Sequence, residues 1–110
     1  MITDVEVKVV QDKSFDKTSD YSWININVNN TRVGKARIFC LGKNLRIHSI
    51  MIFPEFERNG YAESVINLFK EQYEVIVADR VRNTAKGFWE KMDFIGDNSG
   101  NCIWKKGGTI

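Results

Sequence analysis

The segment PEFERNGYAESVINLFK, residues 54–70, connects a short apolar strand directly to an amphipathic helix through a polar turn. The first N–H groups of a helix have no partner inside the helix, and the helix dipole places partial positive charge there. Gly60 and Ala62 would let a diphosphate approach the backbone without a clash with a larger side chain. This order therefore predicts an anion-binding turn that holds Arg58, Asn59 and Gly60 and opens into the helix. The alternative is a glycine that merely starts a helix.

Length and composition indicate one globular domain over residues 1–110. This length allows one hydrophobic core and is too short for two. A hydrophobic content of 43% with 27% charged residues is ordinary for a soluble protein. No apolar run approaches the roughly 18–20 residues that a membrane span needs. The N-terminal sequence MITDVEVKVVQ alternates and carries acids, unlike a signal peptide. We therefore expect a cytoplasmic protein without membrane association.

Metal and nucleic-acid functions receive little support from the residues. Cys40 and Cys102 are not at metal-ligand spacing and the chain has one histidine, so no metal site is expected. Both cysteines are interpreted as reduced core residues. A net charge of +2 is too weak to indicate nucleic-acid binding, and no basic stripe is interleaved with stacking aromatic residues.

Alternating apolar and polar residues predict an antiparallel meander in the first half of the chain. The expected strands cover residues 4–10, about 21–28, 32–41 and 45–53. Asn29 and Asn30 supply a hairpin turn, because asparagine tolerates left-handed backbone conformations. On the third strand we expect an inner face of Ala36, Ile38 and Cys40. The fourth strand becomes apolar on both faces, as expected for a central strand that is covered on both sides.

The second half of the chain predicts helices at 60–72 and about 83–92. The first helix buries Ala62, Val65, Ile66, Phe69 and Tyr73, and the second presents Ala85, Phe88, Trp89 and Met92. Short strands are expected at 74–79, 94–95 and 102–104. Strand 45–53, the first helix and strand 74–79 form a β-α-β unit, so the two strands should be parallel neighbours. The predicted fold class is α+β, with a mostly antiparallel twisted sheet of six to seven strands and two main helices.

Two segments of this order carry a family resemblance. Residues Glu57-Arg58-Asn59-Gly60-Tyr61-Ala62 are similar to the motif Arg/Gln-x-x-Gly-x-Gly/Ala. Residues 83–94 are similar to Asn-x-x-Ala-x-x-x-Tyr-x-Lys-x-Gly-Phe, with Asn83 one residue out of register. Both motifs are those of the GNAT superfamily of acyl-CoA-dependent N-acetyltransferases. With the strand order, the chain resembles this superfamily over residues 22–104.

The chain also departs from the family pattern. Glu57 replaces an arginine or glutamine and puts a carboxylate near the expected pyrophosphate, where Arg58 could compensate. Trp89 replaces a tyrosine and cannot donate a proton to a departing thiolate. Asp93 replaces a glycine, which an aspartate in a left-handed conformation can do. The link 12–20 is too short for the helix pair of many members. The chain therefore resembles a minimal and divergent GNAT protein.

The resemblance implies acetyl-CoA as acyl donor and assigns its contacts. The pantetheine would pair with the backbone around Ile52 and Phe53, at the end of a strand that splays from strand 74–79. The diphosphate would lie over the amides of Arg58, Asn59, Gly60, Tyr61 and Ala62. Asn83 and Phe88 of the second motif complete the expected cofactor-binding residues. For Phe88 the alternative is a place in the core, which is also expected for Trp89.

His48 is the candidate catalytic base, since the family often takes this residue from the same part of the central strand. The ordinary pKa of an imidazole, about 6.5, suits a base near neutrality. The alternative is a half-buried, hydrogen-bonded histidine without a catalytic task. Among general acids, Tyr61 and Tyr73 are more typical of packing residues, and no sequence signal places Tyr21 in the cleft. We expect no dedicated acid, because a thiolate can leave unassisted or be protonated through water.

The resemblance implies acetyl transfer by direct attack of a primary amine, on a protein lysine, an N-terminus or a small molecule. The alternative is a non-catalytic CoA-binding module that regulates or inhibits a partner protein. Lys35, Arg37, Lys43 and Arg46 form either a solvated face or a surface for an acidic acceptor. Expected partners are acetyl-CoA and an amine acceptor, which could be a protein. Exposed strand edges near the C-terminus leave room for a homodimer.

Overall fold

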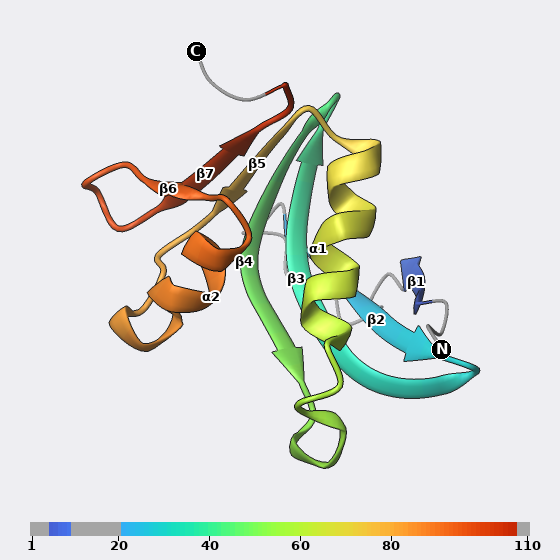
Figure 1. The fold of residues 1–110 in the computed structure, drawn as a ribbon. Helices are drawn as coiled ribbons and strands as arrows, with labels where there is room; N and C mark the ends of the chain where they lie inside the picture. Colours follow the sequence, from blue (N-terminus) through green and yellow to red (C-terminus); the bar gives the residue numbers. More distant parts are fainter. Residues whose placement is uncertain (1–4, 10–20, 108–110) are drawn as a thin grey trace.

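The computed structural model describes residues 5–9 and 21–107, which form one twisted sheet with helices packed on it (Figure 1). Within these residues the strands are β1 (Val5–Val9), β2 (Ser22–Val28), β3 (Thr31–Leu41), β4 (Asn44–Ile52), β5 (Val75–Ala78), β6 (Ile95–Gly96) and β7 (Cys102–Lys105). The helices are α1 (Tyr61–Gln72) and α2 (Lys86–Lys91), each preceded by a 3-10 turn, at Pro54–Phe56 and Asn83–Ala85. The predicted link 12–20 lies outside the described residues.

The seven strands are ordered β1-β2-β3-β4-β5-β7-β6. β4 and β5 are the parallel pair, joined by α1, and the other neighbours are antiparallel. The predicted α+β class and the β-α-β unit are therefore confirmed. The hairpin turn is also confirmed, because Asn29 and Asn30 have φ angles of 52° and 68°.

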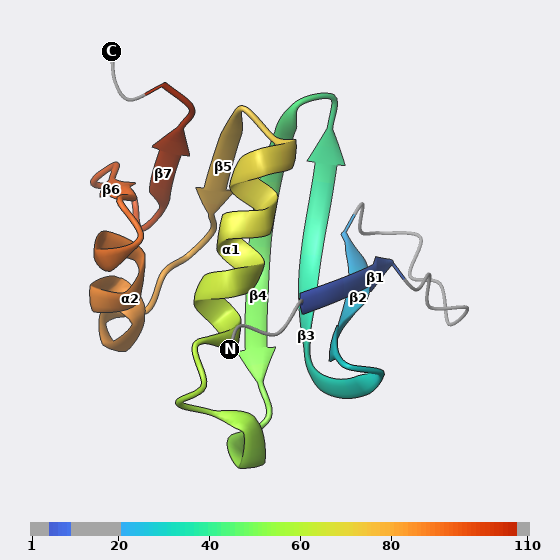
Figure 2. The same cartoon turned by 45° about the vertical axis from the view of Figure 1, so that its right-hand side comes forward.

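Both helices lie on the same face of the sheet, which corrects the expectation that β4 is covered on both sides. Lys91 Nζ of α2 is 2.7 Å from Glu63 Oε1 of α1, and Lys70 Nζ donates to the Met92 carbonyl at 2.6 Å. Figures 1 and 2 show α1 along the middle of the sheet and α2 beside it. The reason is topological. The connection from β4 to β5 contains α1, and the connection from β5 to β6 contains α2. Both connections advance toward the same edge of the sheet, so two crossovers of the same hand place their helices on one side.

The core fills the space between this face and the two helices. Its fully buried side chains include Ile24, Ile26, Val33, Leu45, Ile47, Val65, Ile66 and Ile76. Trp89, Met92 and Phe94 close the core at the α2 end. Ala62, Tyr73, Ala85 and Phe88 are only partly buried, so the predicted helix faces are confirmed in their central residues.

Three local expectations need correction. Cys40 is exposed, although it shares the inner face with Ala36 and Ile38, because it lies near the end of β3. Its Sγ is 3.1 Å from the Tyr73 hydroxyl.

The helix predicted over 83–92 is a 3-10 turn followed by the short α2. β6 starts at Ile95, because the Phe94 N–H still donates to the Trp89 carbonyl and closes α2. The left-handed turn predicted for Asp93 is confirmed, with a φ of 70°.

Gly34 lets β3 approach the end of β4. An alanine Cβ would lie 2.2 Å from the Met51 carbonyl oxygen and 3.1 Å from Ile52 Cα. We expect Gly34→Ala to lower the free energy of unfolding by about 1–3 kcal/mol, measured by urea denaturation. Gly87→Ala in α2 is the matched control, since no atom lies within 4 Å of its added Cβ. Equal stability of the two variants would contradict the close approach.

Candidate functional site

β4 and β5 separate part-way along the sheet. Their last pair is Ile47 with Ala78, after which the Asp79 N–H donates to the Ile47 carbonyl at 2.8 Å. β4 nevertheless continues in register with β3 as far as Ile52. From His48 onward, the β5 side of β4 therefore has no strand partner in the described part of the chain. We call this gap, between β4 after Ile47 and β5 after Ala78, the fork.

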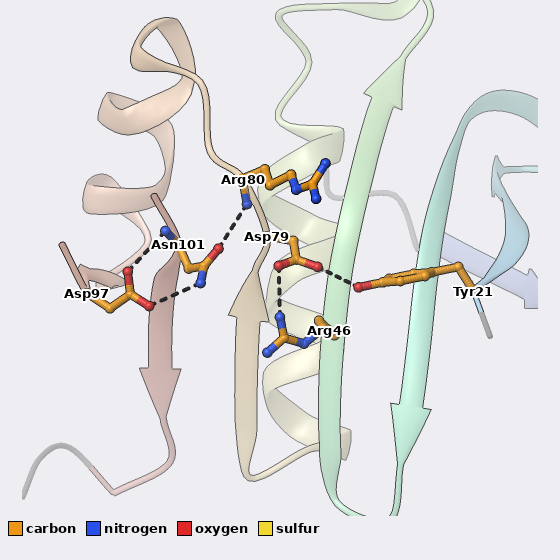
Figure 3. A network of polar contacts seen from close by, with 6 residues as sticks. All are labelled: Tyr21, Arg46, Asp79, Arg80, Asp97 and Asn101. Atoms are coloured by element: carbon orange, nitrogen blue, oxygen red, sulfur yellow. Dashed lines mark hydrogen bonds and ion pairs between the residues drawn. The ribbon is translucent and has the colours of Figure 1, made fainter. Parts of the chain in front are cut away.

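The β5 side of the fork is held open by the β6–β7 turn (Figure 3). Arg80 turns the chain away from β4 with a φ of 49°, and its N–H donates to Asn101 Oδ1 at 3.1 Å. Asn101 Nδ2 in turn donates to Asp97 Oδ2 at 3.1 Å. Hydrogen bonds from the backbone N–H of Ser99 and from Asn101 lower the pKa of the Asp97 carboxyl, so it remains an anionic acceptor for this turn.

The β4 side of the fork offers backbone groups to an extended ligand. The Phe53 N–H donates to the Val33 carbonyl at 2.8 Å, and the Phe53 carbonyl accepts the Phe56 N–H at 2.8 Å. Backbone groups point alternately to the two edges of a strand, so those of Ile52 face the fork. Ile52 can therefore pair with a ligand, whereas both polar backbone groups of Phe53 already have partners.

The turn after β4 leads into α1 through two left-handed residues. Arg58 and Gly60 have φ angles of 68° and 75°, and Gly60 is the N-cap residue of α1. Asn59 Nδ2 braces the turn by donating to the Phe56 and Glu57 carbonyls, at 2.9 and 3.3 Å. No side chain in the described part of the chain caps the first N–H groups of α1. These groups are therefore open to an anion.

The turn before α1 has open space beside it and carries charges of both signs. No atom lies within 4 Å of a Cβ added at Gly60, so the space beside this residue is open. Arg58 and Glu57 are both exposed, and they place opposite charges on adjacent positions. Tyr61 packs partly against the core and Ala62 is half-buried, so the start of α1 is anchored while the turn before it faces solvent.

His48 lies at the start of the free part of β4. Arg37 pairs with Ser49 and Ile38 pairs with Ile47, which leaves His48 as the extra residue of a β-bulge. Its side chain is half-buried, and its ring centroid is 5.2 Å from that of Tyr21. Within the described residues its imidazole forms no hydrogen bond, so both ring nitrogens are available to a ligand.

Tyr21, Arg46 and Asp79 form a polar network (Figure 3), and the Tyr21 ring lies next to that of His48. The Tyr21 hydroxyl donates to Asp79 Oδ2, and Arg46 Nη1 donates to Asp79 Oδ1 at 2.8 Å. Burial, reinforced by the hydrogen bond to Asp79, raises the pKa of the Tyr21 phenol. Arg46 pairs with Val77 and with Phe39, so this network occupies the sheet face opposite the helices.

The residues of the second predicted motif lie beyond the end of β5. Asn83 begins the 3-10 turn before α2 and is exposed. Phe88 is partly buried, and its ring makes an edge contact with Trp89 at 5.0 Å. Trp89 is buried and contacts Phe94 at 4.9 Å, so its predicted place in the core is confirmed. The first predicted motif, residues 57–62, thus follows β4 on one side of the fork. The second, residues 83–94, follows β5 on the other side.

Known proteins share this arrangement of strands and helices. Superposition on the Bacillus subtilis N-acetyltransferase YlbP in complex with coenzyme A gives a TM-score of 0.66 at 15% identity, over 92% of this chain and 96% of YlbP. AtaTR bound with acetyl-CoA gives a TM-score of 0.63 at 10% identity, over 93% of each chain. This chain has the GNAT fold.

The sequence match to a curated relative is shorter. An uncharacterized N-acetyltransferase of Oceanobacillus iheyensis is 33% identical over 51 residues, which are 46% of this chain and 31% of the relative. The match thus spans about a third of the relative's length. No known family profile matches the chain. The resemblance inferred from residues 57–62 and 83–94 is therefore supported at the level of the GNAT fold.

Three residues of this GNAT-fold site were missed or left unplaced by the sequence. No sequence signal placed Tyr21, which lies directly before β2 and which the fold brings to the fork. Asp79 and Arg46 were not assigned a role there. The available signal was the position of Asp79, a polar residue directly after the carboxyl end of a parallel strand, where ligand sites often form.

Other features of the GNAT-fold chain lie away from the fork. A cavity of about 890 Å³ at the α2–β7 end is lined by residues such as Phe94, Ile95, Ile103 and Trp104, and by none of the predicted site residues.

In the described ranges, no helix has the length and apolar character to cross a membrane. In the same ranges, no cluster of three or more His, Cys, Asp or Glu side chains could hold a metal.

Proposed function

We propose that this GNAT-fold chain is an N-acetyltransferase that moves the acetyl group of acetyl-CoA to a primary amine. The acceptor would be a protein lysine, a protein N-terminus or a small amine. The observation that carries the proposal is the fork with His48 at its start, a half-buried imidazole that keeps both nitrogens free of hydrogen bonds in the described structure. The CoA and acetyl-CoA complexes of YlbP and AtaTR support the choice of acyl donor.

Acetyl-CoA would occupy the fork lengthwise. Its diphosphate would contact the amides of residues 58–62, where the uncapped start of α1 favours an anion. Its pantetheine would pair with the Ile52 backbone and pass between β4 and the connection that holds Asn83 and Phe88. This placement puts the thioester near His48, at the closed end of the fork.

The reaction would be a direct attack on the thioester. His48 would accept a proton from the acceptor ammonium, since only the neutral amine has a lone pair for attack. The amine nitrogen then bonds to the acetyl carbon, and the carbon–sulfur bond breaks to give the amide and CoA thiolate. Free backbone N–H groups on β4 would stabilise the oxyanion that develops on the acetyl oxygen. The thiolate takes a proton from water, so no tyrosine is required at position 89.

A second candidate is a non-catalytic module that binds CoA and regulates a partner protein. The observation that favours it is Trp89, which is buried in the core where many GNAT proteins place a tyrosine. Glu57 adds to it, because an exposed carboxylate beside the diphosphate would weaken cofactor binding. For either candidate we propose a cytoplasmic location, consistent with the free thiols of Cys40 and Cys102.

Calorimetric titration with acetyl-CoA, followed by thiol release in the presence of amines, tests both candidates. We expect saturable binding and turnover with at least one member of a panel containing a lysine peptide, an N-terminal peptide and a polyamine. Glu57→Gln should bind acetyl-CoA up to about fivefold more tightly, because removal of an exposed like charge is worth about 0.2–1 kcal/mol.

Glu55→Gln is the matched control, since Glu55 is an exposed acid in the same loop, in the 3-10 turn before Glu57. Equal effects of the two substitutions would show a general charge effect and no specific contact. Binding without turnover across the panel would favour the regulatory module. An absence of binding would reject both candidates.

A further inference from the structure

Tyr21 is the centre of a cluster that joins four strands at the fork. Its ring centroid lies 5.2 Å from that of His48 and 6.0 Å from that of Phe39. The Arg37 guanidinium carbon lies 5.4 Å from the centre of the same ring. Its hydroxyl reaches across β3 and β4 to Asp79 at the end of β5 (Figure 3). The phenol is thus held along its whole length.

Asp79 provides a rigid end point for this phenol. Its backbone N–H donates to the Ile47 carbonyl at 2.8 Å, which fixes it next to the last β4–β5 pair. Its carboxylate is 14% exposed and accepts from Arg46 and from Tyr21. Because a charged hydrogen bond is stronger than a neutral one, the carboxylate holds the Tyr21 hydroxyl firmly.

His48, in contrast, has little else to orient it. It is the extra residue of a β-bulge and has no paired residue on β3. The bulge changes the direction of its side chain. Its imidazole lacks a hydrogen bond within the described structure, and its ring contact is with Tyr21. A residue that must meet an acceptor amine in one orientation is therefore supported by its contact with the Tyr21 ring.

We propose that Tyr21 is a positioning residue that holds the His48 imidazole at the fork, and that the Asp79–Arg46 ion pair fixes Tyr21 for this task. The inference rests on the proposed function, in which His48 is the base. It concerns a residue outside both motifs that carry the GNAT resemblance.

The geometry separates this role from that of a general acid. The Tyr21 hydroxyl directs its proton to the Asp79 carboxylate and not into the fork. Burial and the bond to Asp79 raise the pKa of the phenol, so it keeps its proton at neutral pH. Tyr21 therefore acts through His48, and the departing thiolate receives its proton elsewhere.

The test compares Tyr21→Leu, Tyr21→Phe and Asp79→Asn in the full chain. Because the chain has one histidine, its ring Hε1 proton gives a single imidazole NMR signal. Tyr21→Leu removes the ring contact, so this signal should move towards its position in the urea-unfolded chain. The kcat for acetyl transfer should fall about 100-fold, the cost of misplacing a catalytic group by about 1 Å. The KM for acetyl-CoA should change by less than about twofold.

Tyr21→Phe and Asp79→Asn keep the aromatic ring at position 21 but remove or weaken its hydrogen bond to residue 79. Each should therefore give a smaller shift of the His48 signal and a smaller loss of kcat than Tyr21→Leu. Tyr73→Phe is the matched control: it also removes a hydroxyl contact, that with Cys40 Sγ at 3.1 Å, at the C-terminal end of α1. It should alter neither the signal nor kcat. If Tyr21→Leu fails to fold, the two milder variants decide.

A folded Tyr21→Leu chain with kcat within about threefold of the unsubstituted protein would overturn the inference, as would an unmoved His48 signal. Failure of the proposed function has a different signature, since the unsubstituted protein itself would then lack turnover. In that case the NMR comparison still decides whether Tyr21 orients the imidazole.

Discussion

Replacing His48 with alanine is expected to lower kcat for acetyl transfer by about 10²–10⁴-fold, the usual contribution of a positioned general base. The imidazole lies at the fork between β4 and β5 and has no hydrogen bond in the described chain, so no internal partner competes with the acceptor amine. Acetyl-CoA affinity should be largely retained, because the proposed diphosphate contacts lie at residues 58–62.

The pH dependence of kcat/KM checks this role, because a reaction that needs the deprotonated form of a general base slows as the pH falls. The variant should lose that part of the profile, and no second histidine can replace it. His48→Gln is the matched variant, since it keeps a polar side chain of similar size but cannot act as a base. An unchanged profile in both variants would remove His48 from the mechanism.

Replacing Trp89 with alanine is expected to lower the free energy of unfolding by about 3–5 kcal/mol, as for other large-to-small changes in a core. The side chain is 5% exposed, and its ring centroid lies 5.0 Å from that of Phe88 and 4.9 Å from that of Phe94. Loss of the indole would remove both edge-to-face contacts and leave a cavity in the core next to Phe94.

Urea denaturation followed by far-UV circular dichroism measures this loss, and Trp89→Phe is the matched variant because it retains an aromatic ring. It should lose clearly less stability than Trp89→Ala. If Trp89→Ala cost less than about 1 kcal/mol, the side chain would not be a core residue in solution. A place for Trp89 at the candidate site, and not in the core, would then have to be considered.

The local elements of this fold follow directly from the sequence. The turn at Asn29 and Asn30 adopts the left-handed conformation that asparagine permits, and so does Asp93 in place of a glycine. Helix α1 starts after Gly60, as its glycine and apolar period indicate. The failures occur near the ends of elements. Cys40 is on the predicted face of β3 but is exposed near the strand's end. Residues 83–92 divide into a 3-10 turn and the short α2.

The candidate site is less accessible to sequence reasoning. The residues assigned to the cofactor by resemblance lie on both sides of the fork, and their roles stay predictions. The bulge at His48 cannot be read from β4 alone, because it is defined by the register with β3. Tyr21 and Asp79 are 58 residues apart, and neither belongs to a motif.

The sequence patterns were sufficient to predict the strands, the two helices, the parallel β-α-β unit and the turn at which α1 starts. These depend on side-chain period and on backbone preferences within a few residues, which are local properties of the chain. Three features appear only in the folded chain: both helices share one face, β4 and β5 part after Ile47, and Tyr21 meets Asp79 beside His48. These depend on strand register and crossover direction, which bring together groups that no local pattern connects.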